Sequence, residues 1–439
     1  MPTDSLGNWR RTHLSSEISP KLDGKKVTVF GWVQEIRDLG GIRFVVLRDK
    51  EGIIQVTMPR NKINLKTMEK ADTLQKEFVI GVKGSVKKIS KAPHGAEIIP
   101  DEIKILNKVQ HPMPMDPTGR VPADLDVRLN MRILDLRRPE SQAIFHIRHF
   151  TLRAIREYFI ENGYIEVNTP KMIASATEGG ASLFPIAYYE REAFLAQSPQ
   201  LYKEQLTSVF EKVFEIGPIF RAEESDTPRH LAEVTSVDME AAFTTAEEAM
   251  KVAEELTCHV LKTVKEKCAE GLKILKRKLD VPKTPFERYT YDEILKELRN
   301  ANIAVKWGED IPTPALRTLG ELHKGFYFIT DWPTEAKPFY IKPRDDNPKL
   351  CEAFDFMKGW IEIASGGTRV HSKDLLISRL KAQKLEPRSF EYHLKVFDYG
   401  MPPHAGWGLG LDRLLMVITG KENIREVVLF PRDRWRLTP

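Results

Sequence analysis

The strongest constraint on the fold is a series of short segments rich in β-branched residues between Lys26 and about residue 107. These segments read KVTVFGWV, RFVVLRD, GIIQVTM, FVIGVKGSV and AEIIPDEIKIL, and Gly, Asp and Asn separate them. Several short strands at this spacing predict a small all-β barrel or sandwich. Five strands fit a closed barrel, so we expect residues 1–107 to form one domain.

A proline-rich segment, VQHPMPMDPTGRVPADLD, follows the predicted barrel. Proline lacks a backbone donor and fixes φ, so this segment cannot extend a central strand or a helix. We interpret residues 108–138 as a hinge or linker. Residues 139–439 mix helical and strand patterns without strict alternation, which predicts an α+β domain in which helices flank an antiparallel sheet.

Two amphipathic helices are expected in this larger domain. Residues 141–161 place apolar side chains on one helical face, and Asn162 and Gly163 supply a stop. A second helix is predicted over residues 246–267. Thr244 would open it, with Glu247 three residues later in the spacing of a capping box.

The composition favours a folded soluble protein of two to four domains. The 439 residues are 41% hydrophobic and 29% charged, and the net charge of +5 permits a polyanionic partner without requiring one. Three cysteines without CxxC spacing favour free thiols in a reducing compartment. No segment approaches the roughly 20 apolar residues that cross a bilayer, so we expect a cytoplasmic protein without a membrane partner.

Two further patterns could hold a nucleotide. The segment FRAE at residues 220–223 closes one alternating strand, and a loop returns into a second, TSVDMEAAF. Arg221 could bind a phosphate bidentately, although the hairpin alone is more typical of surface ion pairs. The glycine-rich GWGLGLDR at residues 406–413 leads into a helix, where Arg413 could meet an anion, but many strand-to-helix turns look alike.

Together with GYIEVNTP at residues 163–170, these segments resemble, in order, the three motifs of class II aminoacyl-tRNA synthetases. Motif 2 corresponds to residues 220–240 and motif 3 to residues 408–413. The preceding barrel is that of subclass IIb, whose members use aspartate, asparagine or lysine. The resemblance implies an anticodon-binding barrel of oligonucleotide-binding (OB) type, a class II catalytic domain, ATP and Mg²⁺ as cofactors, and a homodimer. The short chain is similar to the archaeal and eukaryotic type.

Within the subclass, QSPQLYK at residues 197–203 resembles the signature of aspartate-specific members. The Lys203 ammonium would bind the side-chain carboxylate of L-aspartate and discriminate against asparagine. The resemblance makes Arg369 a second clamp and Asp238 the group that orients both cations. The other expected aspartate-binding residues are Glu178, Ser198, Gln200, Arg221 and Ser365.

The resemblance also implies an ATP and metal site. Asp355 and Glu362 fall at alternate positions of FDFMKGWIEIASGG and match the Mg²⁺ ligands, with Ser365 close by. Arg221 and Arg413 are expected to be catalytic. The other expected ATP-binding residues are Glu223, Arg229, His230, Glu362 and Gly410. Val234 stands where many relatives have a phenylalanine that stacks on adenine.

The barrel carries residues that suit tRNA recognition. Phe44 can stack on an unpaired base and Gln55 can bind a base edge, and both match anticodon-reading positions, with Glu97 as a third. Pro93 and Gln34 replace residues typical of members that discriminate between tRNAs. This pattern predicts aspartylation of both tRNA(Asp) and tRNA(Asn).

Three alternatives stay open at this point. An asparaginyl-tRNA synthetase shares the barrel and motifs, but Lys203 argues against it. A tRNA-independent, synthetase-like asparagine synthetase would not need Phe44 and Gln55. A catalytically dead RNA-binding paralogue would be free to lose Arg221, Arg413, Asp355 and Glu362, all of which are present.

Overall fold

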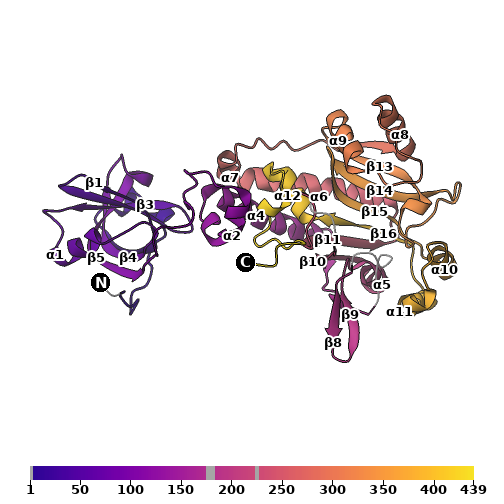
Figure 1. The fold of residues 1–439 in the computed structure, drawn as a ribbon, viewed down its shortest axis with the longest axis horizontal. Helices are drawn as coiled ribbons and strands as arrows, with labels where there is room; N and C mark the ends of the chain where they lie inside the picture. Colours follow the sequence, from indigo (N-terminus) through magenta and orange to yellow (C-terminus); the bar gives the residue numbers. More distant parts are fainter. Residues whose placement is uncertain (1–2, 175–182, 223–226) are drawn as a thin grey trace. The chain divides into compact units, whose positions relative to one another are not determined.

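The computed structural model describes residues 3–174, 183–222 and 227–439. The chain divides into two compact units (Figure 1), unit 1 at Met1–Thr118 and unit 2 at Gly119–Pro439. Each unit has its own hydrophobic core.

Unit 1 is built on a closed five-stranded barrel with strand order β1-β2-β3-β5-β4. Its strands are β1 (Lys26–Asp38), β2 (Ile42–Arg48), β3 (Ile53–Pro59), β4 (Val79–Lys88) and β5 (Ala96–Asn107), and helix α1 (Leu65–Asp72) lies between β3 and β4. Each predicted β-branched segment therefore forms a strand, and the prediction of an OB-type barrel is confirmed. Alternate residues such as Val27 and Val29 are buried because neighbouring side chains on a strand point to opposite faces.

Unit 2 is built on an eight-stranded, mostly antiparallel sheet of order β12-β13-β14-β15-β16-β11-β10-β6. Its strands are β6 (Ile165–Glu166), β10 (Lys212–Phe220), β11 (Glu233–Ala242), β12 (Glu287–Thr290), β13 (Phe326–Pro333), β14 (Leu350–Lys358), β15 (Ile361–Thr368) and β16 (His404–Gly410). A small second sheet pairs β7 (Met172–Ile173), β9 (Arg191–Leu195) and β8 (Pro185–Tyr188). The α+β prediction is confirmed.

Helices flank the large sheet, and α4 and α6 lie together along one of its faces (Figure 1). In the described part of unit 2 the helices are α2 (Leu125–Asn130), α3 (Arg132–Asp135), α4 (Pro139–Glu161), α5 (Gln200–Phe210), α6 (Ala246–Lys267), α7 (Ala269–Ile274), α8 (Tyr291–Asn300), α9 (Thr313–Leu322), α10 (Lys373–Ala382), α11 (Glu391–Leu394) and α12 (Leu411–Thr419).

Both predicted amphipathic helices form. Helix α4 buries its apolar face, including Ile147 and Ile155, in the core of unit 2. Helix α6 has the predicted bounds, but the predicted cap is wrong by one residue. Thr245, not Thr244, accepts the backbone N–H of Glu248, and the Glu248 carboxylate accepts the Thr245 N–H. The capping box is thus Thr245 and Glu248.

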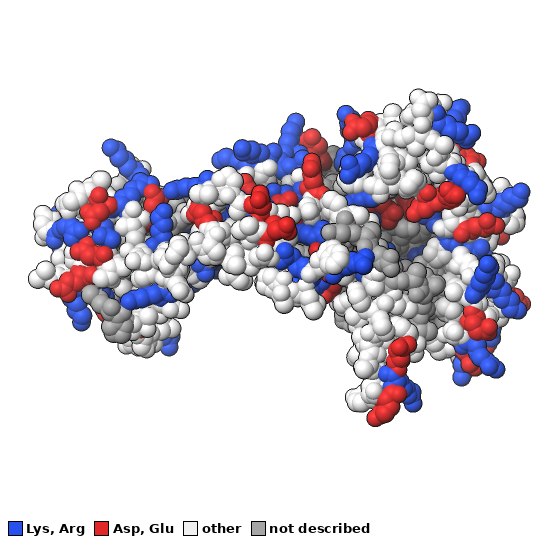
Figure 2. All heavy atoms as spheres, in the orientation of Figure 1, with Lys and Arg blue, Asp and Glu red and all other residues white. Residues whose placement is uncertain are grey.

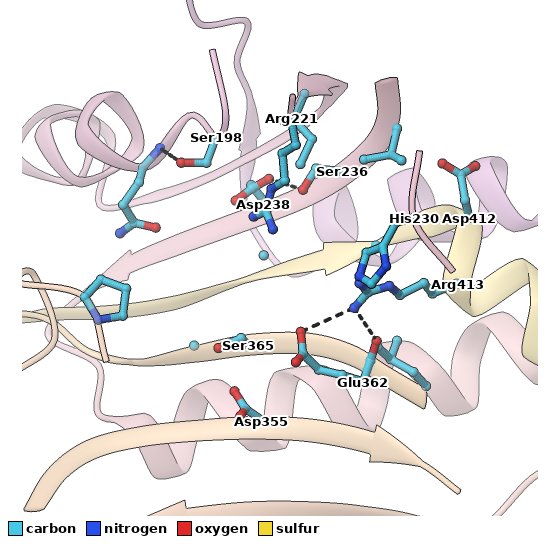
Figure 3. Close-up of a pocket in the computed structure, with 18 of the residues that line it drawn as sticks. Ser198, Arg221, His230, Ser236, Asp238, Asp355, Glu362, Ser365, Asp412 and Arg413 are labelled. Atoms are coloured by element: carbon cyan, nitrogen blue, oxygen red, sulfur yellow. Dashed lines mark hydrogen bonds and ion pairs between the residues drawn. The ribbon is translucent and has the colours of Figure 1, made fainter. Parts of the chain in front are cut away.

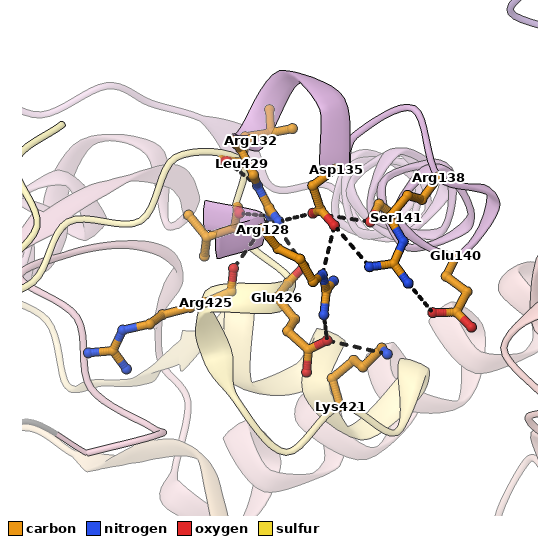
Figure 4. A network of polar contacts seen from close by, with 11 residues as sticks. Arg128, Arg132, Asp135, Arg138, Glu140, Ser141, Lys421, Arg425, Glu426 and Leu429 are labelled. Carbon is orange, nitrogen blue, oxygen red and sulfur yellow. Dashed lines mark hydrogen bonds and ion pairs between the residues drawn. The ribbon is translucent and has the colours of Figure 1, made fainter. Parts of the chain in front are cut away.

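Residues 125–135, which the sequence analysis assigned to a linker, form helices α2 and α3 of unit 2 (Figure 4). The buried Arg132 guanidinium donates to the carbonyl oxygens of Val428 and Leu429 and pairs with Asp135 at 2.5 Å. Arg128 bridges Asp135 and Glu426. These contacts join residues that are distant in sequence, so proline content alone could not reveal that the linker ends earlier.

Basic and acidic side chains are interspersed on the face of the molecule in Figure 2. Among the described residues, no helix is long and apolar enough to cross a membrane.

Candidate active site

A cavity of about 410 Å³ lies in unit 2, where β10, β11, β15 and β16 run side by side (Figure 3). This volume is within the usual range for small-molecule sites. The cavity brings together most of the residues predicted to bind aspartate, ATP or Mg²⁺: Ser198, Gln200, Arg221, Arg229, His230, Asp238, Asp355, Glu362, Ser365, Arg369, Gly410 and Arg413. Val234 also lines it.

Four buried charged residues at one side of the cavity form what we term the inner charge group: Lys203, Asp238, Glu240 and Arg369. Each is no more than 4% exposed. The Lys203 ammonium lies 2.9 Å from Asp238 and 3.4 Å from Glu240. The group contains two cations and two carboxylates, so its charges balance, as burial in a medium of low polarity demands.

Arg369 is oriented by Glu240, not by Asp238 as the resemblance implied. Its Nε and Nη2 atoms donate to the two Glu240 oxygens at 2.9 and 3.2 Å. Burial lowers the pKa of the Arg369 guanidinium, but the Glu240 charge outweighs burial and raises it overall. Glu240 was missed, although it lies two residues after Asp238 on β11 and therefore points to the same face.

Lys203 lies behind Asp238 and does not line the cavity. Its ammonium also donates to the carbonyl oxygens of Met239 and Trp407, so three protein acceptors surround it. Asp238 in turn accepts the Ser236 hydroxyl. Lys203 thus neutralises Asp238 and Glu240 from the side away from the cavity. Arg369 is the cation of the group that lines the cavity.

Glycines of β16 make room for these carboxylates. Residue 406 of β16 is paired with Glu240, and a Cβ atom there would lie 2.3 Å from a Glu240 oxygen. A Cβ at position 408 would lie 3.0 Å from Asp238. Glycine at position 406 therefore allows the buried acid to fit, in addition to any approach to a ligand.

At the other end of the cavity, Arg413 and Glu362 form what we term the outer charge pair. The Arg413 guanidinium donates to the Glu362 carbonyl at 3.0 Å and lies 3.4 Å from its carboxylate (Figure 3). The side chains are 22% and 41% exposed, so solvent reaches both. Arg413 lies in the first turn of α12, where backbone N–H groups also favour an anion.

Arg229 lies near this end and is held by two contacts. Its Nη2 atom donates to the Thr313 hydroxyl at 2.9 Å, and its guanidinium lies 4.4 Å from the centre of the Trp360 ring. His230 also lines the cavity, and its Nδ1 atom is 2.6 Å from the Thr227 hydroxyl. The nearby Arg413 adds to burial in lowering the pKa of Arg229.

Asp355 and Glu362 lie on the neighbouring strands β14 and β15, not at alternate positions of one strand as predicted. Asp355 is buried and paired with the Lys337 ammonium at 2.6 Å. Burial, with a contribution from the Glu362 charge, raises the pKa of Asp355 to about 6 against the opposing effect of Lys337. Lys337, which also lines the cavity, was missed in the sequence.

The donor set fits a magnesium ion shared with a nucleotide. Two carboxylates that repel each other, Asp355 and Glu362, lie beside the Ser365 hydroxyl in the cavity. In the described chain, no group of three or more His, Cys, Asp or Glu side chains is placed to hold a metal. Mg²⁺ needs no such group, because waters and phosphates complete its coordination.

Asp412 lines the cavity and connects motif 3 to motif 2. Its carboxylate accepts the Thr235 backbone N–H at 2.9 Å and pairs with Arg148 of α4. Arg148 also donates to the Thr235 hydroxyl. Neither Asp412 nor Arg148 could be assigned a role from the sequence, because a contact between α4 and α12 leaves no local pattern.

The predicted Glu178 and Glu223 lie outside the described residues. In unit 1, Phe44 of β2 and Gln55 of β3 are partly buried. The Gln55 amide donates to the buried Glu97 carboxylate at 3.0 Å. Gln34 lies where a bulge interrupts the pairing of β1 with β2, and Pro93 begins a short turn before β5.

Two family models match the chain. Residues 124–434 match "tRNA synthetases class II (D, K and N)", and residues 27–106 match "OB-fold nucleic acid binding domain". The first match covers more than half of the chain, and the second coincides with the barrel strands.

Curated relatives match over nearly their whole length. The aspartate–tRNA(Asp/Asn) ligase of Methanothermobacter thermautotrophicus is 53% identical over 99% of this chain and 100% of its own. The ligase of the same name from Methanopyrus kandleri is 54% identical over 97% and 99% of the two chains.

Solved structures agree on the fold. The asparaginyl-tRNA synthetase of Pyrococcus horikoshii, complexed with asparaginyl-adenylate, has a TM-score of 0.93 at 33% identity and covers 98% of this chain and 100% of its own. A putative aspartyl-tRNA synthetase from Leishmania major has a TM-score of 0.88 at 28% identity, with coverage of 100% and 97%. By the family match, the full-length relatives and the shared fold, the chain belongs to the class II tRNA synthetases of the D, K and N group.

Proposed function

We propose that this protein attaches L-aspartate to tRNA(Asp), and also to tRNA(Asn), through an aspartyl-adenylate made from ATP. The observation that carries the proposal is Arg369, a buried cation that lines the cavity and is backed by the charge-balanced inner group. The names and full-length identity of the archaeal relatives support the same activity.

Recognition of aspartate would depend on the inner charge group. Arg369 would bind the substrate's side-chain carboxylate. Lys203 would keep the electrostatic potential there favourable for an anion, because it neutralises Asp238 and Glu240. Asparagine would bind poorly because its neutral amide leaves Arg369 without a second anion. Ser198, Gln200 and Glu178 would hold the ammonium side of the substrate.

Activation would rest on positioning and charge stabilisation. Arg221 would hold the aspartate α-carboxylate in line with the α-phosphate of ATP. The carboxylate would attack that phosphate, and pyrophosphate would leave. Arg413, Arg229 and His230 would bind the outer phosphates. Mg²⁺ on Asp355, Glu362 and Ser365 would supply charge neutralisation when bound. Glu223 and Gly410 would contact the nucleotide, and adenine would lie near Val234, which packs on it without aromatic stacking.

Transfer would follow when the ribose 3′-hydroxyl at the tRNA end attacks the adenylate carbonyl and AMP leaves. The barrel would select the tRNA through Phe44, Gln55 and Glu97. Gln34 and Pro93 would give relaxed selection between tRNA(Asp) and tRNA(Asn), in keeping with the names of the relatives.

Assembly and location complete the proposal. Strand β6 is the edge of the eight-stranded sheet, and its Ile165 is 45% exposed. An exposed apolar edge suits a second copy of this chain, so we expect a homodimer across motif 1. A cytoplasmic location would keep the three free cysteines as thiols.

The decisive experiment is charging of labelled aspartate onto two transcripts, tRNA-Asp with anticodon GUC and tRNA-Asn with anticodon GUU. We expect both to accept aspartate and neither to accept asparagine. Charging of the GUC transcript alone would remove the relaxed specificity assigned to Pro93 and Gln34. Charging with asparagine would favour an asparaginyl-tRNA synthetase.

The remaining rivals are separated by omitting tRNA. ATP consumption with aspartate and ammonia that yields asparagine would favour a synthetase-like asparagine synthetase. If no amino acid supports pyrophosphate exchange, the protein would be a tRNA-binding paralogue without catalytic activity. We expect exchange with aspartate only.

A further inference from the structure

A second buried cluster lies directly behind the cavity, formed by Glu204 of α5, His393 of α11 and His404 of β16. Each of the three side chains is 0% exposed. The Nε2 atoms of His393 and His404 lie 3.5 and 3.7 Å from the same oxygen of Glu204. Buried ionisable groups are costly unless they are paired, and none of the roles proposed above uses these three.

The other oxygen of Glu204 is connected to the cavity by Gln200. The Gln200 Nε2 atom donates to it at 2.6 Å, and Gln200 lines the cavity. A carboxylate only accepts hydrogen bonds, so the NH₂ group of Gln200 must turn toward Glu204. Its carbonyl oxygen is then the atom presented to a ligand, and it suits a donor such as an ammonium group.

The hydrogen bonds of the two imidazoles differ. His393 Nδ1 lies 3.1 Å from the amide nitrogen of Gln205, which donates to it, so His393 carries its proton on Nε2 and can be neutral. His404 Nδ1 donates to the Pro402 carbonyl at 2.7 Å. Because its Nε2 atom also faces a carboxylate, His404 needs a second proton there to make a favourable contact.

Charge balance points the same way. Glu204 lies close enough to the inner charge group that its charge helps to raise the pKa of Arg369. The Arg369 backbone N–H also donates to the His404 carbonyl. With Glu204 included, the buried carboxylates number three and the cations Lys203 and Arg369 number two. One further positive charge restores the balance.

We propose that Glu204 and His404 form a buried carboxylate–imidazolium pair that positions Gln200 and keeps the pocket electrically neutral, so that the anionic side chain of the substrate can bind. This inference rests on the proposed aspartate activation. Both residues act through others and are positioning residues.

The surroundings support the ionised pair. Burial alone would raise the pKa of Glu204, but His393 and His404 hold it below its ordinary value. Burial alone would lower the pKa of His404, but Glu204 and then Glu240 raise it above the ordinary value for histidine. The charged or titratable groups that surround His404 are Glu204, Glu240, Arg369, His371 and His393.

The test is pyrophosphate exchange without tRNA, in which KM for aspartate and KM for ATP are measured between pH 6 and 9 with a thermal midpoint for each variant. We expect H404Q, which leaves the pocket with one excess negative charge, to raise KM for aspartate about tenfold or more at pH 7.5. KM for ATP should stay within about twofold, because the proposed phosphate site lies at the other end of the cavity.

Two comparisons identify the charge as the cause. Adding E204Q to H404Q restores the balance, and we expect it to recover much of the lost aspartate affinity, which a packing defect would not allow. With E204Q alone, the rise of KM for aspartate with pH should begin at a lower pH than in the wild type. Asparagine, as a competitive inhibitor with a neutral side chain, should show little change in Ki.

E77Q is a matched control, because Glu77 is equally buried and ion-paired with Arg48 but lies in unit 1. It should lower the thermal midpoint without changing KM for aspartate. Unchanged KM for aspartate in H404Q, or equal shifts of both KM values, would overturn the inference. A wild-type protein without aspartate-dependent exchange would instead refute the proposed function.

Discussion

The inner charge group and the outer charge pair lie at the two ends of one cavity but differ in burial and pairing. Lys203, Asp238, Glu240 and Arg369 are at most 4% exposed and contact one another at 2.9 to 3.4 Å. The Arg413 and Glu362 side chains are 22% and 41% exposed. The first set is fixed before any ligand arrives, whereas the second can exchange its partner for a phosphate.

This difference suits the ligand that each end would bind in the proposed function. A small side chain that differs from its competitor by one charge is discriminated best by rigid, desolvated charges, because an unpaired group there is costly. A triphosphate carries enough charge to be attracted through partly hydrated cations, which can also release pyrophosphate. Four experiments distinguish the two ends of the cavity, in order of decreasing predicted effect.

Replacing Lys203 with Met should have the largest effect. It leaves Asp238 and Glu240 buried without their shared cation, and breaking such a pair costs about 3–5 kcal/mol. We expect kcat/KM for aspartate in pyrophosphate exchange to fall by about a thousandfold or more. Lys342→Met, which removes a partly exposed cation from an ion-pair network, is the control and should retain most activity. An active K203M enzyme would remove the basis for a balanced inner charge group.

Replacing Arg413 with Ala should lower kcat for exchange by about a hundredfold to a thousandfold, because a charge that stabilises the pyrophosphate is lost. The guanidinium is partly exposed, so the thermal midpoint should change little. Aspartate binding, measured by calorimetry without ATP, should be normal. Exchange at a near-normal rate would refute the role assigned to Arg413.

Replacing Trp360 with Leu should have a moderate effect on ATP. The guanidinium carbons of Arg229 and Arg317 lie 4.4 and 5.1 Å from the centre of the Trp360 ring. A cation–π contact contributes about 0.5–2 kcal/mol, so KM for ATP should rise roughly threefold to tenfold. W360F preserves an aromatic face and should behave nearly as the wild type. A change confined to KM for aspartate would show that Arg229 serves the wrong end of the cavity.

Raising the salt concentration should have the smallest effect and separate the two ends in the unmodified protein. Between about 50 and 500 mM KCl, screening weakens partly exposed charges more than buried ones. KM for ATP should rise about twofold to fivefold, while KM for aspartate stays within about twofold. Sodium acetate at matched ionic strength controls for a specific effect of chloride. A steeper response of aspartate would contradict the burial of its site.

Local pattern predicted a large part of the molecule. The barrel strands followed from β-branched runs, and α4 followed from its apolar face. Arg221, Asp355, Glu362, Arg369 and Arg413 were found because ordered motifs resembled a family, and the structure brings them to one cavity. Glu240 was within reach of the same reasoning, because it is two positions from Asp238 on one strand.

Other features depend on contacts between distant segments. Arg132 fixes α2 and α3 against residues 425–429, so residues that looked like a linker belong to unit 2. Likewise, the pairing of Arg369 with Glu240 joins positions 129 apart in the chain. No local periodicity encodes such pairs.

The order of strands, helices and motifs is a property of the sequence itself, because hydrophobic periodicity and turn residues act over a few positions. Which carboxylate meets which cation was decided only when the sheet placed β11 between β10 and β16 and helix α5 packed against β10 and β11. Burial makes each of these ion pairs necessary, because an unpaired charge inside the protein has a high free-energy cost. The tertiary structure therefore determined that Lys203 stands behind Asp238 and that Arg369 faces the cavity.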